Sequence, residues 1–516
     1  MGSLTRREVL TALVGAPFAG TLLSCERAPE IPLEGELLGP SESFGHHLRD
    51  PLPVSAWANA PTRRTEVAIV GGGPAGLSAA WRLLRRGQQD LRVVELEPRL
   101  GGTSASGRSA VTPFPWGAHY LPLPPASNHA LRSLLQEMGA IDDARPAEEV
   151  LVREPDERVF YQGYWYPGLY PYAGASADDL AQLARFEARV ASLVDAFQIP
   201  MRLSSRAPEL LALDEIDAER WLRDLGFDSP RLFWLCDYAC RDDYGLRLRD
   251  TSAWAFLFYW ASRADAEGES APLLTWPEGN GALVKHLGDA LGDRQKLRRL
   301  AVHVREEAEG VRVLLAGPDG DREVLVASRA ILAVPRFVAR RLVPQLELTT
   351  EGFDQGAWLV ANLHLQNRPP GRGVGPAWDN VLYDSPSLGY VVATHQRGRE
   401  TGPTVWTYYL PLCQRDPRES RRALLEAEHE VLAEGAVRDL ERAHPTLRQH
   451  LGQIDIWRWG HAMTRPRVGF LRGGARFHAG APRGRIHFAH SDLSGVAIFE
   501  EAFDHGVRAA DEVMAA

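Results

Sequence analysis

The chain has 516 residues, of which 45% are hydrophobic and 24% charged, a composition typical of globular proteins and a length sufficient for two domains. Its formal net charge of -9 argues against a nucleic acid partner, which would favour a basic face. Four cysteines are too few for a disulfide framework. Cys236 and Cys240 are one helical turn apart but have no second pair of ligands nearby, so we predict buried thiols and no metal site.

The first 25 residues have the organisation of an export signal. Arg6 and Arg7 precede an uncharged stretch, Val9 to Ser24, that is too short to span a membrane comfortably and contains a proline. The arginine pair resembles a twin-arginine signal, and Leu-Leu-Ser-Cys ending at Cys25 resembles a lipoprotein box. We therefore expect an exported protein that is periplasmic or anchored to the outer side of a membrane only through a lipid on Cys25. The alternative is an ordinary amphipathic N-terminal helix.

Residues 26–62 are rich in Pro, Gly and Ser and show no sustained hydrophobic period. Such composition is typical of irregular backbone, so this segment is predicted to be a spacer. The folded part is expected to begin at Arg63.

A glycine-rich turn follows a buried apolar strand and opens an amphipathic helix. Gly71 permits the tight turn, Gly73 lets a pyrophosphate approach the backbone, and Gly76 lets the helix pack on the strand. The pyrophosphate would lie at the helix N-terminus, where free N–H groups attract anions. The pattern predicts a dinucleotide site in a Rossmann-like α/β domain. Its expected contacts are Gly71, Gly73, Pro74, Ala75 and Gly76.

A carboxylate at the end of the next strand is expected to accept hydrogen bonds from the ribose hydroxyls. Glu95 ends the run Leu-Arg-Val-Val-Glu at the expected distance from the glycines. Glu97 is the alternative, because it is two residues further and would point to the same face of a continuing strand. We favour Glu95.

The next segment resembles flavoproteins of the amine oxidase and phytoene desaturase superfamily. The resemblance rests on Gly101 and Gly102 after the ribose acid and on Gly117 and Ala118 further along. It implies FAD as cofactor, with the double glycine near the phosphates and the later run beside the flavin ring. Thr103, also an expected contact, replaces the arginine that usually follows the glycines. Arg108 is a candidate for the missing cation.

Three later segments extend this resemblance over most of the chain after residue 63. They imply that backbone near Val302 faces the adenine, that residues 328–335 form a strand ending beside the cofactor, and that Asp492 contacts the ribityl and pyrophosphate region. Residues Gly495 to Glu501, with Gly495 and Val496 as expected cofactor contacts, would then begin a helix whose N-terminus points at the flavin. The chain departs from its relatives at His490 and Glu501, where they often carry glycine.

The resemblance implies two interleaved domains. Residues 63–125, 275–345 and 480–516 would form the Rossmann-like FAD-binding domain, and residues 126–274 and 346–479 a mixed substrate domain of strands and helices. A pocket is expected at their junction, over the flavin.

Aromatic and histidine side chains near the expected flavin are candidates for the substrate side. His119 and Tyr120 follow the glycine-alanine run, and Trp457, Trp459 and His461 precede the C-terminal motif. We predict catalytic roles for His119 and His461 and pocket positions for the other three. The alternative is that the histidines are partly buried and structural, and that the aromatic rings belong to a core.

Relatives that oxidise amines commonly hold a water molecule with a lysine on the strand that here reads Trp-Leu-Val-Ala-Asn-Leu-His-Leu. Asn362 is the nearest match, with Val360 or Ala361 in its place if the register differs. A neutral amide can hold water but cannot change its charge. We therefore predict an FAD-dependent oxidoreductase that takes hydride from a small amine or polyene and passes electrons to an unidentified acceptor. The alternative is a tethered flavoprotein that carries electrons or binds a ligand without turnover.

Overall fold

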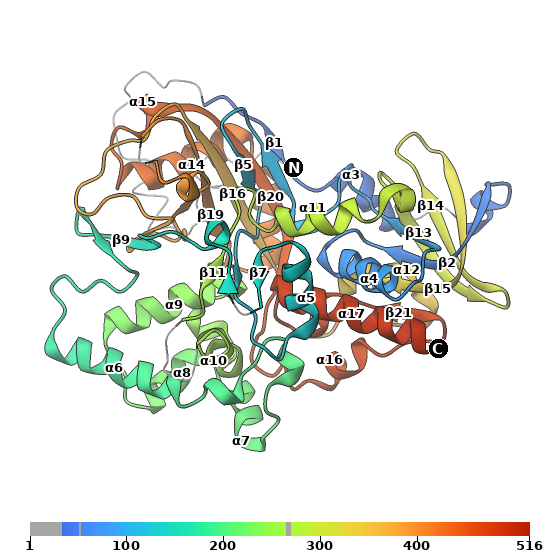
Figure 1. Cartoon of the computed structure of the whole chain (residues 1–516), viewed down its shortest axis with the longest axis horizontal. Helices are drawn as coiled ribbons and strands as arrows, with labels where there is room; N and C mark the ends of the chain where they lie inside the picture. The colour runs from blue at the N-terminus through green and yellow to red at the C-terminus, as the bar shows by residue number, and fades with distance from the viewer. Residues whose placement is uncertain (1–32, 51–52, 144, 265–269, 400) are drawn as a thin grey trace.

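A computed structural model describes residues 33–50, 53–143, 145–264, 270–399 and 401–516. The predicted export signal and Cys25 lie outside these ranges. Within them, no helix combines the length and apolar character needed to cross a bilayer. The molecule has two sheets and a group of helices, arranged as the mixed α/β, two-domain fold that we predicted (Figure 1).

The first sheet has seven strands. The order is β12 (Gln295–Lys296), β3 (Leu91–Val94), β2 (Thr62–Val70), β15 (Arg322–Leu332), β14 (Gly310–Ala316) and β13 (Leu300–Glu307), with β21 (Ile486–Phe488) also beside β15. Strands β12, β3, β2, β15 and β21 pair in parallel, whereas β13, β14 and β15 form an antiparallel meander. The carboxyl ends of β2 and β3 therefore meet at one edge, where a doubly wound sheet binds its ligand.

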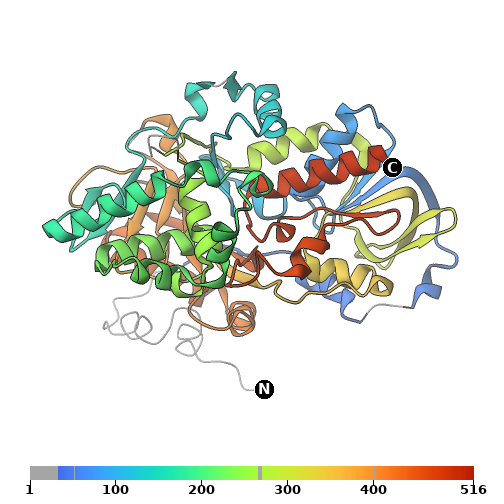
Figure 2. The ribbon, with the colours of Figure 1, turned by 90° about the horizontal axis from the view of Figure 1, so that it is seen from below.

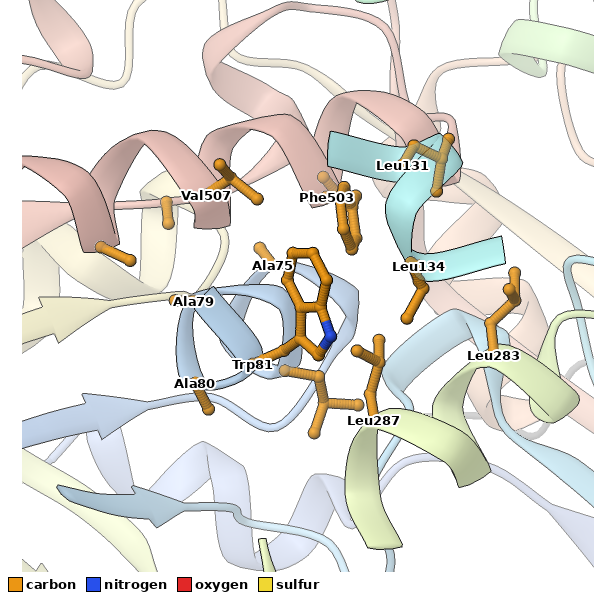
Figure 3. Close-up of a cluster of buried hydrophobic side chains, with 14 of the residues drawn as sticks. Ala75, Ala79, Ala80, Trp81, Leu131, Leu134, Leu283, Leu287, Phe503 and Val507 are labelled. Carbon is orange, nitrogen blue, oxygen red and sulfur yellow. The ribbon is translucent and has the colours of Figure 1, made fainter. Parts of the chain in front are cut away.

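Helices α4 (Pro74–Arg85), α5 (His129–Glu137), α11 (Gly281–Asp289) and α17 (Phe499–Ala515) pack together beside this sheet (Figure 3). Helix α4 begins with a proline at its first turn, a position where the missing N–H costs nothing. Its residue Trp81 packs against Phe503 of α17, with ring centroids 5.4 Å apart. This packing joins α4 to the C-terminal helix of the chain beside the first sheet.

The second sheet has eight strands. The order is β1 (Leu37–Leu38), β20 (Leu451–Thr464), β16 (Gln355–Leu365), β19 (Thr404–Pro411), β18 (Tyr390–Val392), β17 (Asp379–Leu382), β9 (Glu157–Tyr161) and β10 (Tyr164–Pro167). Helices α13 (Pro417–Glu426), α14 (His429–Glu441) and α15 (Leu447–His450) follow β19 and precede β20. Side chains of β16, β19 and β20 form an apolar core with α13 and α14, and a second aromatic cluster lies around Trp358, Tyr409 and Trp459.

A helical layer lies on the same half of the molecule as the second sheet (Figure 2). It comprises α6 (Ala177–Ala191), α8 (Ala218–Asp224), α9 (Pro230–Tyr244) and α10 (Ala253–Ala261), which share one apolar core. Cys236 and Cys240 are buried in this core and unpaired, as predicted. The remaining elements are short: α3 (Glu42–Gly45), β4 (Ser106–Arg108), β5 (Pro113–Pro115), β6 (Leu121–Pro122), β7 (Ile141–Asp142), β8 (Arg145–Pro146), α7 (Pro208–Leu211), β11 (Leu273–Leu274), α12 (Arg336–Leu342) and α16 (Gly474–Ala479).

The predicted spacer, over its described part, is instead an ordered strap that touches both halves. Leu37 and Leu38 pair in parallel with Ile456 and Trp457 at the edge of the second sheet. Further along, Trp57 is 1% exposed and donates its indole N–H to the carbonyl of Leu315 in the first sheet, at 2.8 Å. The composition correctly indicated irregular backbone, but it did not show that long-range contacts bury a few apolar side chains.

Candidate active site

The three glycines of the turn between β2 and α4 have different surroundings, and these fit the three roles predicted for them. Gly71 has φ +109°, and a Cβ there would lie 2.3 Å from the carbonyl oxygen of Ala333. A Cβ at Gly76 would lie 1.9 Å from the carbonyl oxygen of Gly71. At Gly73, by contrast, no described atom other than those of its two chain neighbours lies within 4 Å of an added Cβ. The open space faces the first turn of α4, which includes Pro74 and Ala75 and is suited to an anion.

Glu95 and Glu97 have different surroundings. The Glu95 carboxylate accepts the N–H of Gly72 at 2.6 Å and the N–H of Glu97 at 2.8 Å. Burial raises its pKa to about 7, opposed by these hydrogen bonds. The Glu97 carboxylate accepts the backbone N–H and the hydroxyl of Ser41 in the strap, both at 2.8 Å. Glu95 therefore lies within the glycine turn, whereas Glu97 anchors the strap, and Glu95 remains our predicted ribose ligand.

The second and third glycine segments pack close to the first. Gly101 and Gly102 have φ +122° and +53°, and a Cβ on Gly102 would lie 3.5 Å from the Cα of Gly73. Thr103 accepts the N–H of Ala118 at 3.1 Å, and a Cβ on Gly117 would lie 2.3 Å from the same Thr103 carbonyl oxygen. Three motifs from separate parts of the sequence thus line one continuous path. Arg108 is exposed on β4, and its predicted role as the missing cation remains a prediction.

The C-terminal motif holds a buried carboxylate at the start of α12. Asp492 is 1% exposed and accepts the backbone N–H of Arg336 at 2.8 Å and the side-chain amide of Gln355 at 2.9 Å. Burial would raise the pKa of Asp492, but His490 and these donors hold it below its usual value. Asp492 therefore stays ionised and can accept further hydroxyl donors.

The turn after Asp492 differs in detail from the expectation. Gly495 has φ +80°, Val496 is fully buried, and the following helix begins at Phe499, four residues later than Gly495. The Glu501 carboxylate accepts the Ser494 hydroxyl and the backbone N–H of Met201, so the unusual glutamate ties this turn to the helical layer. On β13, the register shifts between Ala301 and His303, so Val302 stands at a bulge whose backbone leaves the regular ladder.

A cavity of about 140 Å³, open to solvent on one side, lies where the two halves meet. Thr103, Gly117, Ala118, His119, Tyr120 and Trp459 line it, and the run from Ala497 to Glu500 at the start of α17 closes one side. His119 stacks on Tyr409 with ring centroids 4.8 Å apart. Burial lowers the pKa of His119 to about 4, so this imidazole is neutral at pH 7. The cavity thus lies between Gly117 and Ala118, which are expected beside the flavin, and the aromatic side chains that are expected to contact the substrate.

The other candidates lie outside the lining of this cavity. Trp457 lies two residues before Trp459 on β20. It stacks on Trp116, with ring centroids 4.0 Å apart. His461 is exposed and packs against Phe337, at 4.5 Å between centroids. Asn362 is 1% exposed and donates its amide to Pro115 and Thr407, while Val360 of the same strand reaches the cavity. The roles predicted for these three residues remain predictions.

The sequence interpretation missed a set of charged side chains in the cavity wall. Asp242 and Asp243 come from the end of α9, Glu500 from the first turn of α17, and Arg263 from the segment after α10. Arg263 donates to Asp243 at 2.6 Å. Burial raises the pKa values of Asp242 and Glu500 to about 7. The only available signal was the pair of aspartates inside the apolar sequence Tyr-Ala-Cys-Arg-Asp-Asp-Tyr.

The described residues contain no group of three or more His, Cys, Asp or Glu side chains suited to a metal ion. The site instead fits a dinucleotide. The space at Gly73 is open, the glycines permit close approach of a pyrophosphate, the Glu95 carboxylate can accept from a ribose, and a cavity lies beside Gly117. The fold and this site define an FAD-dependent oxidoreductase.

The profile of the family described as flavin containing amine oxidoreductase matches residues 74–514, and the chain belongs to this family. It is 26% identical over 294 residues to amine oxidase [flavin-containing] B of Sus scrofa. That match covers 54% of this chain and 52% of the relative, so the chain spans about half the length of the curated relative it matches.

Solved structures share the fold at low identity. Putrescine oxidase bound to putrescine superposes with a TM-score of 0.65 at 20% identity, covering 88% of this chain and all of that one. Cyclohexylamine oxidase from Brevibacterium oxydans gives 0.62 at 16% identity, covering 87% and 98%. A fatty acid isomerase from P. acnes gives 0.62 at 16% identity over the same shares. The same fold therefore accepts amines and a lipid, and the substrate must be argued from the site.

Proposed function

We propose that this flavoenzyme oxidises a small cationic amine. The observation that carries the proposal is the charge of the cavity wall. Asp242, Asp243 and Glu500 line the cavity, and Arg263 is the one cationic side chain among the described residues that line it. Arg263 is hydrogen-bonded to Asp243, so an uncharged polyene would leave Asp242 and Glu500 without a bound cation, whereas an ammonium group would compensate them. The amine bound in the putrescine oxidase structure and the name of the curated relative agree with this choice.

The residues that line the cavity have different proposed roles in this reaction. Bound FAD supplies the hydride acceptor for the C–H bond next to the substrate nitrogen. Tyr409, Trp459 and His119 form an aromatic wall that can hold an amine and exclude water. Since the pKa values of Asp242 and Glu500 are raised to about 7, each is partly ionised at neutral pH, and a carboxylate oxygen there can take the proton that an ammonium must lose. No lysine lines the described cavity, so we assign this proton to the carboxylates.

The test is anaerobic reduction of the purified holoenzyme by a panel of amines, alcohols and polyenes. We expect an amine to bleach the oxidised flavin absorbance and Glu500→Gln to slow that bleaching by roughly a hundredfold, with unchanged FAD content. Glu154→Gln, an exposed position, is the control. Bleaching by a polyene but by no amine would contradict the proposal. No bleaching by any compound, with ready reduction by a protein partner, would support an electron carrier.

We further propose that the enzyme is exported by the twin-arginine route and held by a lipid on Cys25. The support is the sequence of residues 6–25 together with the cofactor, because a route that carries folded proteins lets FAD bind in the cytoplasm. Replacing both Arg6 and Arg7 by lysine should leave loaded enzyme in the cytoplasm, and Cys25→Ala should release exported enzyme from membranes. Normal periplasmic levels of the lysine variant would contradict the route.

A further inference from the structure

A short run of backbone is hydrogen-bonded along its whole length. Residues 115–119, which we call the flavin-side run, line part of the cavity and contain the segment expected beside the flavin ring. The N–H groups of Trp116 and Ala118 donate to the carbonyls of Ala105 and Thr103, both at 3.1 Å. These two acceptors follow the double glycine, so the N–H groups tie the run to the cofactor path.

Five successive carbonyl groups of the flavin-side run each accept a hydrogen bond from a different residue. The acceptors and donors are, in order, Pro115 and the Asn362 amide at 3.1 Å, Trp116 and the Trp459 indole at 2.6 Å, Gly117 and the Tyr409 hydroxyl at 2.9 Å, Ala118 and the Asn280 backbone N–H at 3.1 Å, and His119 and the Thr275 hydroxyl at 2.8 Å. The peptide groups 115–116 and 117–118 are therefore bonded at both their C=O and N–H ends. Neither can rotate without losing a hydrogen bond.

Three of these donors come from one face of the second sheet. Asn362, Tyr409 and Trp459 belong to β16, β19 and β20, which are neighbours in the order β20, β16, β19. Tyr409 and Trp459 also line the cavity. Tyr408, the preceding residue on β19, points to the opposite face, where it packs in the core with α13 and α14. Two aromatic side chains of the cavity wall thus hold the run with their polar ends.

The hydroxyl of Tyr409 keeps its proton at neutral pH. Burial raises the pKa of Tyr409 well above its usual value, so the hydroxyl remains a hydrogen-bond donor. A peptide group carries a dipole of about 3.5 D, and the positive end of a donor offsets the negative end of the carbonyl that it contacts. Removing the donor leaves more negative charge beside the cavity, which disfavours the electron-rich reduced form of a flavin there.

We propose that Asn362, Tyr409 and Thr275 are positioning residues, which fix the peptide groups beside the flavin ring and thereby raise the reduction potential of bound FAD. They act through the carbonyls of the flavin-side run. Asn362, which was expected to hold a water molecule, gives its amide hydrogen bonds to Pro115 and to the Thr407 hydroxyl. The inference rests on the FAD cofactor of the family and does not depend on which substrate is oxidised.

The test is the midpoint potential of the purified holoenzyme, measured by equilibration with a reference dye and a chemical reductant in the absence of substrate. Tyr409→Phe keeps the ring and removes the hydroxyl. We expect it to lower the potential by about 30 mV, a tenfold change in a two-electron equilibrium, and to shift the visible absorbance of the bound flavin. The matched control is Tyr408→Phe, which removes a hydroxyl that donates to Asp439 at 3.1 Å on the opposite face. It should keep the parental potential and spectrum.

Thr275 provides a rescue. Thr275→Val removes the donor to the His119 carbonyl with little change of shape, whereas Thr275→Ser keeps the donor. We expect the valine variant to lower the potential and the serine variant to stay near the parent. A role in packing alone would give the opposite order, because serine is the smaller side chain. Asn362→Leu, which removes the donor to Pro115 at similar size, should lower the potential as the valine variant does.

The outcomes separate this inference from a purely structural role and from the proposed function. Parental potentials and spectra in Tyr409→Phe, Thr275→Val and Asn362→Leu, with lower midpoints of urea unfolding, would overturn the inference. An equal shift in Tyr408→Phe would also overturn it, since that hydroxyl lies on the other face of the sheet. Failure of every amine to bleach the flavin would overturn amine oxidation and leave the measured potentials as they are.

Discussion

The cofactor path and the substrate cavity meet at Gly117, but backbone atoms form the path and side chains form the cavity wall. The path is made of backbone: glycines at 71, 73, 76, 101 and 102, with two buried carboxylates whose hydrogen bonds are made within the chain. The cavity wall is made of side chains from α9, the end of α10, β19, β20 and α17, and several of their polar atoms, including Asp243 Oδ2, have no partner among the described residues. Cofactor binding is thus a property of local backbone geometry, whereas substrate binding exists only after distant elements have packed.

The largest effect should come from the glycines, and it differs between neighbours. Gly76→Val would force a side chain into the carbonyl of Gly71, so we expect the variant to lose about 4 kcal/mol or more of stability and to be insoluble. Gly73→Val meets only open space, so the variant should fold normally yet purify without colour. Circular dichroism and flavin absorbance of the two variants measure this. A yellow, fully loaded Gly73→Val protein would show that the pyrophosphate does not approach this residue.

A smaller effect concerns the pH dependence of stability and arises in the cavity wall. Glu500 has its pKa raised by burial from its ordinary 4.5 to about 7, so its contribution to stability is complete below pH 4.5 and is lost as the pH rises through 7. The loss amounts to about 3 kcal/mol. Glu500→Gln should therefore lose less stability than the parent between pH 5 and pH 8 in urea unfolding. Parallel losses in the two proteins would mean that Glu500 is ionised without cost and is not a buried ligand group.

The smallest effect concerns the strap, which belongs to neither region. Ser41→Ala removes one hydrogen bond to Glu97 and should cost about 1 kcal/mol of unfolding free energy while leaving FAD content unchanged. The exposed Ser43→Ala is the matched control. Loss of FAD from the Ser41 variant would instead make the strap part of the cofactor site.

The difference between the two regions also explains what the sequence could predict. The α/β architecture and the FAD cofactor followed from short motifs, because close backbone approach restricts which residues can stand at positions such as Gly71 and Gly102. The start of α17 was expected near Gly495 and lies at Phe499, since nothing local distinguishes an extended turn from a first helical turn there.

The charged cavity wall could not be predicted in the same way. Asp242 and Glu500 are far apart in the sequence, and each looks like an ordinary surface acid until packing places it in the cavity wall. The strap was missed for the same reason, because its register with β20 depends on contacts between the two ends of the chain. Properties that arise from burial at long range leave no local periodicity to detect.

The strap also sets an order of assembly. The N–H of Glu36 donates to the side chain of Asp455, across a separation of 419 residues, and Leu37 pairs with Ile456. A segment made near the beginning of synthesis therefore cannot take its native place until almost the whole chain has emerged, and contacts so remote in sequence are slow to form. Closing the strap over the loop that carries Glu97 therefore belongs to the same late stage as the packing of α4 against α17, where Arg82 pairs with Asp511 across 429 residues.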